Sequence, residues 1–479
     1  MRVHVLGGWS PLAPEPERLQ SEQMPVSPAR AAAFDILLRV ESESSFASEL
    51  LHSATYHRLS TPDHALATDL VMGVVRWRSR LDHEIAAAAA QPLARLDLEV
   101  LVALRLALYQ FRWLDRIPQR AALHESVELV KRARKRSAAP FVNAVLRKIG
   151  AAHQYPEGHD RMGSENEMTP EGLARALAHP LWLVERWARE YGIAAARRIC
   201  EHDQSIPTTA IRVRAPIAEA ELSELTQAGV MLTPGMLLAS TRRVAAGDIT
   251  KARAFRTGQV VIQDEASQLV AALVGQGAGN GTRILDCCAA PGGKTLAIAD
   301  HNSQANITAV ELHPHRARLV QRLLQTPHSP ARIQIVIADA RHLPLSVQFD
   351  RILADVPCSG TGTLARNPEI KWRLKPYDLS QLQARQSAIL RSALAQVAPG
   401  GRVIYSTCSL EKEENEDVVE QVLAGDRSIH LLNCRTELDR LMTAGDLIWP
   451  DSASLTRGPY LRTIPGIQAC DGFFAAILE

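Results

Sequence analysis

Short apolar segments alternate with helical segments from Gly258 to the end of the chain. Each has the length of a buried strand and is bounded by polar or turn residues. A strand–helix alternation predicts an α/β, Rossmann-like fold with a doubly wound, mostly parallel sheet. Because such a sheet binds ligands at the carboxyl ends of its strands, the residues that follow the strands are the candidate site. The predicted strands are QVVIQ (259–263), RILDCC (283–288), NITAVE (306–311), IQIVIAD (333–339), FDRILADV (349–356) and GRVIYST (401–407).

The rest of the 479-residue chain is long enough for further folded units. From Ala29 to Ile149, apolar residues recur at three- and four-residue spacing, which predicts an all-α domain. From Leu173 to about Ile249, helical segments give way to short strand-like segments, which predicts a small α+β unit. We therefore expect a disordered leader at 1–28, an all-α domain at 29–150, a polar linker at 151–170, a small α+β unit at 171–250 and an α/β, Rossmann-like domain at 251–479.

The composition is that of a globular protein, with 46% hydrophobic and 22% charged residues and a net charge of +2. No apolar run is long enough for a signal sequence or a membrane span, so we expect a cytoplasmic protein. The 7 cysteines include no CxxC pair, which excludes the familiar zinc spacings, and their odd number does not suit a disulfide framework. We expect reduced thiols that are available for chemistry, and no metal.

The loop after RILDCC ends like a phosphate-binding loop but does not begin like one. A P-loop needs a glycine five residues before Gly-Lys-Thr, and Cys288 occupies that position. The GxGxxG fingerprint of dinucleotide-binding folds is absent as well. Small residues still let backbone N–H groups and a helix N-terminus approach a ligand closely. We expect Cys287 to pack inward and Cys288 to begin the ligand loop.

Two carboxylates that end the next two strands indicate the kind of ligand. Glu311 lies about 20 residues beyond the loop, where an acid can bind a pair of ribose hydroxyls. Asp339 ends the following strand and is suitably placed for an exocyclic amine. Together with the loop, these residues suit a nucleoside without a pyrophosphate, such as S-adenosylmethionine. The alternative is that both carboxylates only cap helices or face solvent.

Two cysteines follow apolar strands and have Ser, Thr and Gly neighbours. Cys358 comes after FDRILADV and Cys408 after GRVIYST, so both lie where ligands bind in an open α/β sheet. A thiolate near a cationic group such as Lys294 is a candidate nucleophile. The other isolated cysteines, Cys200, Cys434 and Cys470, are expected to be small buried hydrophobes.

A thiolate beside a methyl sulfonium suits methylation at C5 of a pyrimidine. C5 of cytosine is too weak a nucleophile to attack a methyl group alone, whereas addition of a thiolate to C6 makes C5 enamine-like. C5 then takes the methyl group and loses its proton, and the thiolate is eliminated. A hydrogen bond at N3 assists the addition, and Asp355 is the nearest candidate in sequence. The alternative is that Asp355 is a turn residue that caps its own backbone.

The motifs DCCAAPGGKT, DVPCSGTG and YSTCS resemble those of the Sun (NSUN-type) family of RNA 5-methylcytosine methyltransferases. RTGQVVIQDEASQL, NPEIKW and DGFFAAIL also match, and the resemblance extends from about His179 to the end of the chain. It implies that Cys408 adds to C6 and that Cys358 assists release of the methylated base, with Lys294 and Asp355 beside them. The family usually has Asp where this chain has Glu311. The resemblance places S-adenosylmethionine against Cys288, Ala289, Ala290, Pro291, Gly292, Gly293 and Lys294, with Glu311, Asp339 and Asp355 alongside.

The all-α region resembles the NusB-type RNA-binding fold, through LVMGVVRW, LRLALYQF and FVNAVLRKI. We interpret a basic run in this region as a patch that binds RNA phosphates; the alternative is a solvated helix end. Arg76, Arg78 and Arg80 are candidates to extend the patch around Trp77, which we expect in the core. With both resemblances together, we expect a monomeric enzyme that methylates ribosomal RNA, most simply the 16S RNA of the small subunit. The run consists of Lys131, Arg132, Arg134, Lys135 and Arg136.

Other classes of function fit less well. A non-catalytic RNA-binding or assembly factor with a degenerate methyltransferase fold would be expected to have lost a cysteine or the AAPGGK loop, and neither is lost. A nucleotide-dependent kinase would need the missing P-loop glycine. DNA 5-methylcytosine methyltransferases use the cysteine of a Pro-Cys motif, here Cys358, as the nucleophile. The presence of Cys408 in a Thr-Cys motif distinguishes the RNA enzymes, again by resemblance.

Overall fold

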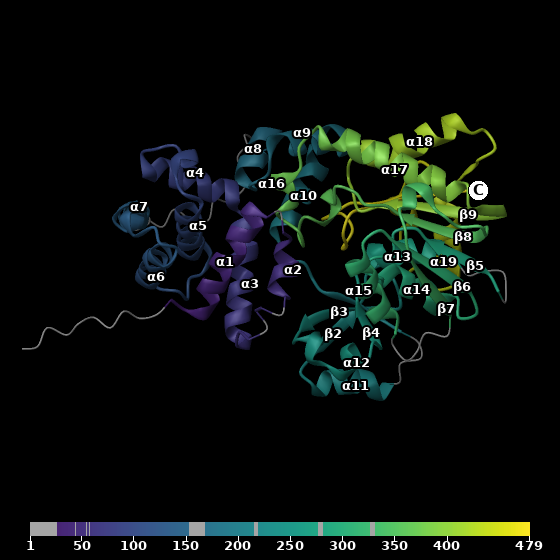
Figure 1. Cartoon of the computed structure of the whole chain (residues 1–479), viewed down its shortest axis with the longest axis horizontal. Coiled ribbons are helices and arrows are strands. Elements are labelled where there is room, and N and C mark those ends of the chain that lie inside the picture. The colour runs from purple at the N-terminus through teal and green to yellow at the C-terminus, as the bar shows by residue number, and fades with distance from the viewer. Residues whose placement is uncertain are drawn as a thin grey trace, which may run out of the picture.

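A computed structural model describes residues 26–479 apart from 44, 54, 57, 153–167, 215–218, 276–280 and 326–330. Most of the expected leader and linker lies outside these described residues. A helical unit built from the N-terminal part of the chain stands beside a larger α/β unit, and a small sheet lies below their junction in Figure 1. Within the described part of the chain, no helix combines the length and the apolar character needed to cross a membrane.

The N-terminal unit is a bundle of helices around α5 (Leu98–Trp113). This helix buries residues on all of its sides, which is typical of a helix in the centre of a bundle. Its neighbours bury apolar stripes against it, so that their side chains form one core. The expected all-α region is therefore confirmed. The surrounding helices are α1 (Pro28–Ser42), α2 (Ala47–Leu51), α3 (Thr61–Arg76), α4 (Arg78–Ala89), α6 (Gln119–Arg132) and α7 (Ala139–Ala152).

Three further helices, α8 (Pro170–Ala176), α9 (Leu181–Tyr191) and α10 (Ile193–Gln204), follow the helical bundle. Their buried side chains share a hydrophobic core with Leu364 and Leu379 of the α/β unit. These helices are thus packed onto the α/β unit rather than onto the small sheet that comes next in the sequence.

The small sheet is antiparallel and has the strand order β2-β3-β1-β4. The expectation that QVVIQ belongs to the parallel sheet is wrong, because its residues form β4 (Val260–Ile262), which pairs with β1. Val260 packs with Ile211 of β1 in a separate small core, and this contact fixes the strand in the small sheet. The other elements are β1 (Ala210–Val213), β2 (Met231–Pro234), β3 (Thr241–Ala246), α11 (Glu219–Gln227) and α12 (Arg253–Arg256).

The large sheet has the order β11-β12-β13-β9-β8-β5-β6-β7, and β10 also pairs with β13. The five strands from β9 to β7 are parallel, as the strand–helix alternation predicts, and the remaining pairs are antiparallel. The parallel strands are β5 (Arg283–Asp286), β6 (Asn306–Glu311), β7 (Arg332–Ile337), β8 (Phe349–Asp355) and β9 (Val397–Thr407); the others are β10 (Leu431–Leu432), β11 (Thr456–Arg457), β12 (Tyr460–Thr463) and β13 (Phe473–Leu478).

Helices cover both faces of this sheet (Figure 1). Ile284 of β5 belongs to the core under α13 and α14, whereas the adjacent Leu285 belongs to the core under α17 and α18. Because successive side chains point to opposite faces, a strand covered on both sides is a continuous apolar run. The helices are α13 (Glu265–Leu273), α14 (Gly293–His301) and α19 (Cys434–Thr443) on one face and α17 (Asp378–Leu394) and α18 (Glu416–Gly425) on the other.

The helical bundle is docked on the NPEIKW segment, which lies shortly after the Cys358 loop. The indole nitrogen of Trp372 donates to the carbonyl of Val75 at 2.7 Å. Arg373 Nη2 donates to the carbonyls of Val40 at 2.7 Å and Ser45 at 2.6 Å. Both donors lie in or next to α16 (Ile370–Arg373). Backbone carbonyls of the bundle are thus bound by side chains of the α/β unit.

Two contacts reinforce this interface. The Ala47 amide donates to the carboxylate of Glu369 at 2.9 Å, and Arg76 Nη2 donates to the carbonyl of Ala365 at 2.8 Å. Glu369 and Arg76 are both buried. Since a buried charged group is costly unless it is hydrogen-bonded, these contacts tie the orientation of the bundle to the segment that leaves the cysteine loop.

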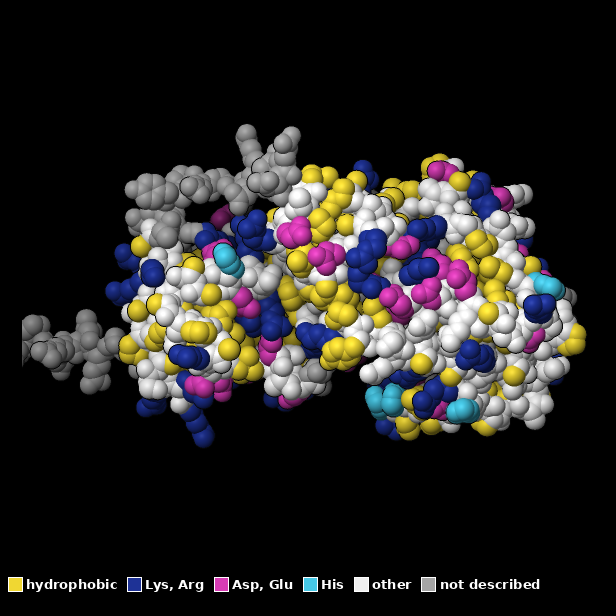
Figure 2. Space-filling model, turned by 90° about the horizontal axis from the view of Figure 1, so that it is seen from above, with side chains coloured by type: hydrophobic (Ala, Val, Ile, Leu, Met, Phe, Trp, Pro, Cys, Tyr) yellow, Lys and Arg dark blue, Asp and Glu magenta, His cyan; other side chains and the backbone are white. Residues whose placement is uncertain are grey.

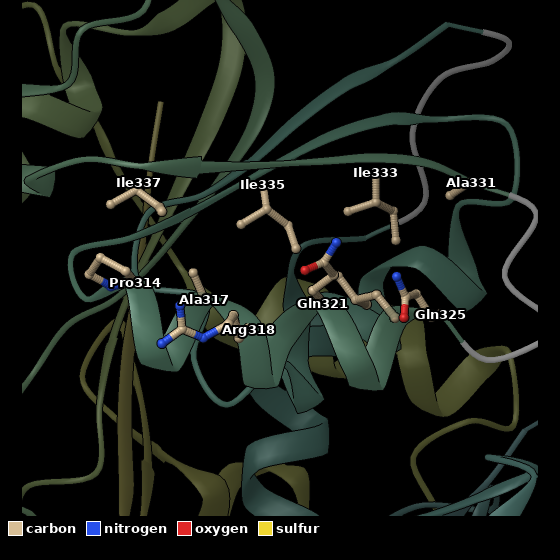
Figure 3. A pocket seen from close by; sticks show the side chains of 10 residues that line it. Pro314, Ala317, Arg318, Gln321, Gln325, Ala331, Ile333, Ile335 and Ile337 are labelled. Carbon is tan, nitrogen blue, oxygen red and sulfur yellow. The ribbon is translucent and has the colours of Figure 1, made fainter.

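A groove of about 520 Å³ lies between the edge strand β7 and α15 (Pro314–Leu324). Figure 3 shows Ile333, Ile335 and Ile337 of β7 above the helix, with Ala317 and Gln321 facing them. None of the residues predicted for the functional site lines this groove.

Candidate active site

The ligand loop joins the end of β5 to the start of α14. Gly292, with φ of 111°, precedes the helix in a backbone conformation that favours glycine. Cys287 is buried as expected, and Cys288 is partly exposed at the start of the loop. The loop therefore brings small residues and the N-terminal turn of α14 to the carboxyl edge of the sheet.

Asp286, at the end of β5, holds this loop in place and was not predicted as a site residue. Its carboxylate accepts hydrogen bonds from Thr295 Oγ1 at 2.7 Å and from the Cys288 amide at 3.3 Å. Burial raises the pKa of Asp286 to about 6. An acid that ends an apolar strand directly before a loop of small residues was the available sequence signal.

The two predicted nucleoside-binding carboxylates lie at the ends of neighbouring strands, as expected, but each also accepts a hydrogen bond from a backbone amide. Glu311 is buried and accepts from the His313 amide at 2.9 Å through Oε1. Asp339 accepts from the Arg341 amide at 2.9 Å and pairs with the guanidinium at 2.6 Å. The hydrogen bond and charge of Arg341 lower the pKa of Asp339 to about 2. The helix capping that the sequence left open as an alternative is thus present at Asp339, which caps the short helix that follows it, whereas Glu311 binds the turn before α15.

The two cysteines predicted for catalysis meet at the ends of neighbouring strands. β8 and β9 are parallel and paired up to Asp355 and Ser406, so the loops that follow them start at the same level. The Sγ atoms of Cys358 and Cys408 lie 3.3 Å apart, and both residues are partly exposed. The hydrogen bond with Cys408, burial and the nearby charges of Cys408 and Glu414 hold the pKa of Cys358 well above its usual range. Cys200, Cys434 and Cys470 are buried, as expected.

Lys294 links the ligand loop to the cysteine strands. Its Nζ lies 2.9 Å from Asp355 Oδ2, and Ser406 donates to Asp355 Oδ1 at 2.8 Å. Nζ also lies 4.9 Å from the ring centre of Phe473, a favourable distance for a cation–π contact. Burial lowers the pKa of Lys294, but the charge and hydrogen bond of Asp355 outweigh it, so that the pKa is raised. The Asp355 carboxylate is engaged by Lys294 and Ser406 rather than by its own backbone.

Comparison with known proteins decides the family. A model of the 16S rRNA methyltransferase RsmB/F family matches residues 277–479, and a model of the NusB family matches residues 27–151. The probable ribosomal RNA small subunit methyltransferase B of Bacillus subtilis (strain 168) is 34% identical over 402 residues, which cover 81% of this chain and 87% of the relative. The chain belongs to the RsmB/F family of ribosomal RNA methyltransferases.

Other comparisons agree with this membership. The ribosomal RNA small subunit methyltransferase B of Vibrio cholerae serotype O1 is 31% identical, with 94% of this chain and 97% of the relative covered. The crystal structure of PH0851 has a TM-score of 0.76 at 22% identity and covers 95% of this chain and 99% of its own. NSun6 from Pyrococcus horikoshii, solved with SFG, has a TM-score of 0.53 at 19% identity over 63% of this chain and 98% of its own. The structural likenesses support the fold.

As a member of the RsmB/F family, the protein is an S-adenosylmethionine-dependent RNA methyltransferase with a NusB-type helical domain. The residues around the ligand loop fit that cofactor. The loop offers small residues and a helix N-terminus, and Glu311 uses Oε1 in its hydrogen bond with His313. Among the described residues, Glu311 Oε2 accepts no hydrogen bond, so an acceptor remains for a ribose hydroxyl.

The basic run of this RsmB/F member is largely paired with acids of its own domain. Lys131 pairs with Glu128, Arg132 with Asp35 and Lys135 with Asp97. Figure 2 shows basic and acidic side chains interspersed over the face it presents. In the part of the chain that the structure describes, two side chains of the run are exposed and make no ion pair: Arg134 and Arg136.

The candidate extension of the run fails at Arg76, which is buried and donates to the carbonyl of Ala365 at the domain interface. Arg78 lies 3.2 Å from Glu41, and Arg80 lies 4.0 Å from Glu84. Trp77 is partly buried against the helical core, where its ring stacks on that of Trp113.

Proposed function

We propose that this protein methylates C5 of a cytosine in small-subunit ribosomal RNA through a covalent bond between Cys408 and C6. The observation that carries this proposal is the 3.3 Å separation of the Cys358 and Cys408 sulfurs. Two thiols this close can act on adjacent atoms of one base. The names of the relatives support ribosomal RNA of the small subunit as the substrate.

Cys408 is the proposed nucleophile, because Cys358 is held as a neutral thiol in the resting site. The hydrogen bond with Cys408 and burial raise the pKa of Cys358, which favours its neutral thiol, and a neutral Cys358 can donate to the Cys408 sulfur across the 3.3 Å that separates them. The Cys408 thiolate adds to C6, and the electron pair of the C5–C6 double bond becomes available at C5 and N3. Asp355, paired with Lys294, is proposed to stabilise charge or share a proton at N3.

Cys358 is proposed to act after methylation. Once the Cys408 sulfur is bonded to C6, it no longer carries the charge that raises the pKa of Cys358. Cys358, which is partly exposed, can then give its own proton to water, and the resulting thiolate takes the proton of C5. The C5–H electron pair re-forms the C5–C6 double bond, and the bond between C6 and Cys408 breaks, which returns the thiolate.

The cofactor loop from Cys288 to Lys294, with Glu311, Asp339 and Asp355, is proposed to hold S-adenosylmethionine. When bound, the cofactor supplies an electrophilic methyl group for C5. Glu311 offers its second oxygen to the ribose, and Gly292 and Gly293 let the backbone approach. For Asp339 the proposal requires that its pairing with Arg341 leaves one face of the carboxylate accessible.

The proposal is tested with the purified protein, methyl-tritiated S-adenosylmethionine and small-subunit ribosomal RNA. We expect tritium in RNA, and 5-methylcytidine as the labelled nucleoside after digestion. Bisulfite sequencing of ribosomal RNA from a deletion strain should show one cytosine that has lost its protection, restored by the wild-type gene and not by Cys408→Ala. Label in another nucleoside would contradict the C5 assignment.

A further inference from the structure

A buried carboxylate, Glu414, receives hydrogen bonds from several sides beside the cysteine pair. It is fully buried in the short turn after β9. Its Oε1 accepts from the Ser359 amide at 2.8 Å and from Gln386 Nε2 at 2.8 Å. Its Oε2 accepts from the Ser409 hydroxyl at 2.5 Å and from the Ser359 hydroxyl. A site with four donors around two oxygens suits an ionised carboxylate, which has only acceptors.

The two serines that bind Glu414 are the sequence neighbours of the two cysteines. Ser359 directly follows Cys358, and Ser409 directly follows Cys408. The same carboxylate therefore binds the residue after each cysteine. Strand pairing between β8 and β9 ends at Asp355 and Ser406, before the cysteines are reached. Beyond the strands, the relative position of the two loops depends on side-chain contacts of this kind and on backbone bonds such as that from the Gly362 amide to the Cys408 carbonyl at 2.9 Å.

We propose that Glu414 is a positioning residue that holds the Cys358 and Cys408 loops at the separation which the two-thiol reaction needs. Glu414 itself lies behind the serines and acts through them. The catalytic role of this positioning rests on the proposed function, whereas the separation of the two sulfurs is a property of the protein alone. It is measurable without RNA or cofactor.

The measurement is the rate at which Cys358 and Cys408 form a disulfide. Diamide removes two electrons and two protons from the thiol pair and is itself reduced to the hydrazine. The cross-linked peptide pair is quantified by mass spectrometry over time. The rate depends on the approach of the two sulfurs and on the fraction of thiolate.

Removal of Glu414 should change the rate of disulfide formation in opposite directions through the separation of the sulfurs and through the thiolate fraction. The charge of Glu414 contributes to the raised pKa of Cys358, after the hydrogen bond with Cys408, burial and the charge of Cys408. Loss of that charge alone would increase the thiolate fraction and speed the oxidation. Loss of positioning would slow it. A slower reaction therefore reports position and not charge.

We expect Glu414→Ala to slow disulfide formation by at least about tenfold, because misplacement of reacting atoms by an ångström costs factors of this size or more. Glu414→Gln should react at the wild-type rate or faster, since its amide can accept at Oε1 and donate to the two serine hydroxyls while the charge that raises the pKa of Cys358 is lost. The matched control is Glu411→Ala. Glu411 is also buried in this segment, but its carboxylate binds Trp187 and Arg186 of α9.

If Glu414→Ala does not fold, the double variant Ser359→Ala/Ser409→Ala provides the test, because it removes the hydroxyl anchors and keeps the carboxylate. Folding is followed by the thermal midpoint of each variant. A wild-type disulfide rate in a folded Glu414→Ala or in the double variant would overturn the proposal, as would equal slowing by Glu411→Ala. If the protein transferred no methyl group to cytosine, the disulfide rates would be unaffected, so the two proposals fail separately.

Discussion

The sulfurs of Cys358 and Cys408 lie 3.3 Å apart although 50 residues separate them in the sequence. The pairing of β8 with β9 brings the two loops to one level of the sheet, and Lys294 reaches Asp355 from the ligand loop beside them. This arrangement connects the region expected to hold the cofactor with the region expected to hold the base.

Cys408→Ala should abolish methyl transfer, with a loss of roughly 10⁴-fold or more, because no other group supplies the bond to C6. Affinity for S-adenosylmethionine, measured by calorimetry, should stay close to that of the wild type, since the sulfur is proposed to touch the base. Cys434→Ala, a change in the buried core under α19, is the matched control and should remain active. Substantial turnover by Cys408→Ala would refute its assignment as the nucleophile.

Asp286 should make stability depend on pH. Burial raises its pKa to about 6, whereas the ordinary value is 3.8. The folded state keeps a proton that the unfolded state releases. The contribution of Asp286 to the free energy of unfolding is therefore fully present below pH 3.8 and is lost as the pH rises through about 6. As the pH rises through this window, the free energy of unfolding of Asp286→Asn should therefore increase by about 3 kcal/mol relative to that of the wild type.

Thermal unfolding at a series of pH values from roughly 3.5 to 7 measures this difference, because this range includes both the unfolded and the folded pKa of Asp286. Thr295→Val is the matched variant: it removes the hydrogen bond that lowers the pKa of Asp286, so the upper end of the window should move to higher pH. A constant difference between the wild type and Asp286→Asn at every pH would show that the carboxyl does not titrate in this range.

Glu369→Ala should loosen the helical bundle from the catalytic unit. The Ala47 amide then loses its buried acceptor, and a hydrogen bond to a charged group contributes about 1.5–3 kcal/mol. Hydrogen exchange at Ala47 should accelerate by roughly 10- to 100-fold if exchange follows local opening. Glu43→Ala, which removes an exposed partner of Arg39 within the bundle, is the control and should leave this amide unchanged. Unchanged exchange in Glu369→Ala would mean that the interface does not depend on this hydrogen bond.

The basic run should contribute to RNA binding mainly through the side chains without acidic partners. Arg134→Ala/Arg136→Ala should reduce the slope of log affinity against log salt by roughly 0.7–0.9 for each RNA phosphate that is no longer neutralised. Replacement of all five basic residues of the run should add little to that change, because the other three pair with Glu128, Asp35 and Asp97. Arg435→Ala/Arg440→Ala on α19 is the matched control. An unchanged slope in the first variant would assign RNA docking to another surface.

Local patterns predicted the parallel strands and the position of each cysteine at a strand end, because apolar runs and strand ends are local properties. QVVIQ was misplaced because three apolar residues pair equally well in either sheet, and its partner β1 lies about fifty residues earlier. The pairing of the basic run depends on Asp35 and Asp97, which are distant in sequence. Arg76 was expected at the surface, and only the docking of two domains buries it.

Glu414 could not be predicted for a similar reason. It belongs to EKEEN, a charged stretch with the composition of a solvated surface. Its burial follows from Ser359, which is 55 residues away. The NPEIKW motif is comparable: the resemblance gave it no role, and the structure shows it holding the helical bundle.

The covalent intermediate tests the central claim most directly. Cys358→Ala and Cys408→Ala are each incubated with ribosomal RNA and S-adenosylmethionine and run on a denaturing gel. If Cys408 adds to C6 and Cys358 is needed for elimination, Cys358→Ala should accumulate a slower protein band that RNase removes, and Cys408→Ala should show none. Adducts in Cys408→Ala and none in Cys358→Ala would reverse the roles of the two cysteines, and no adduct in either variant would contradict the two-thiol mechanism.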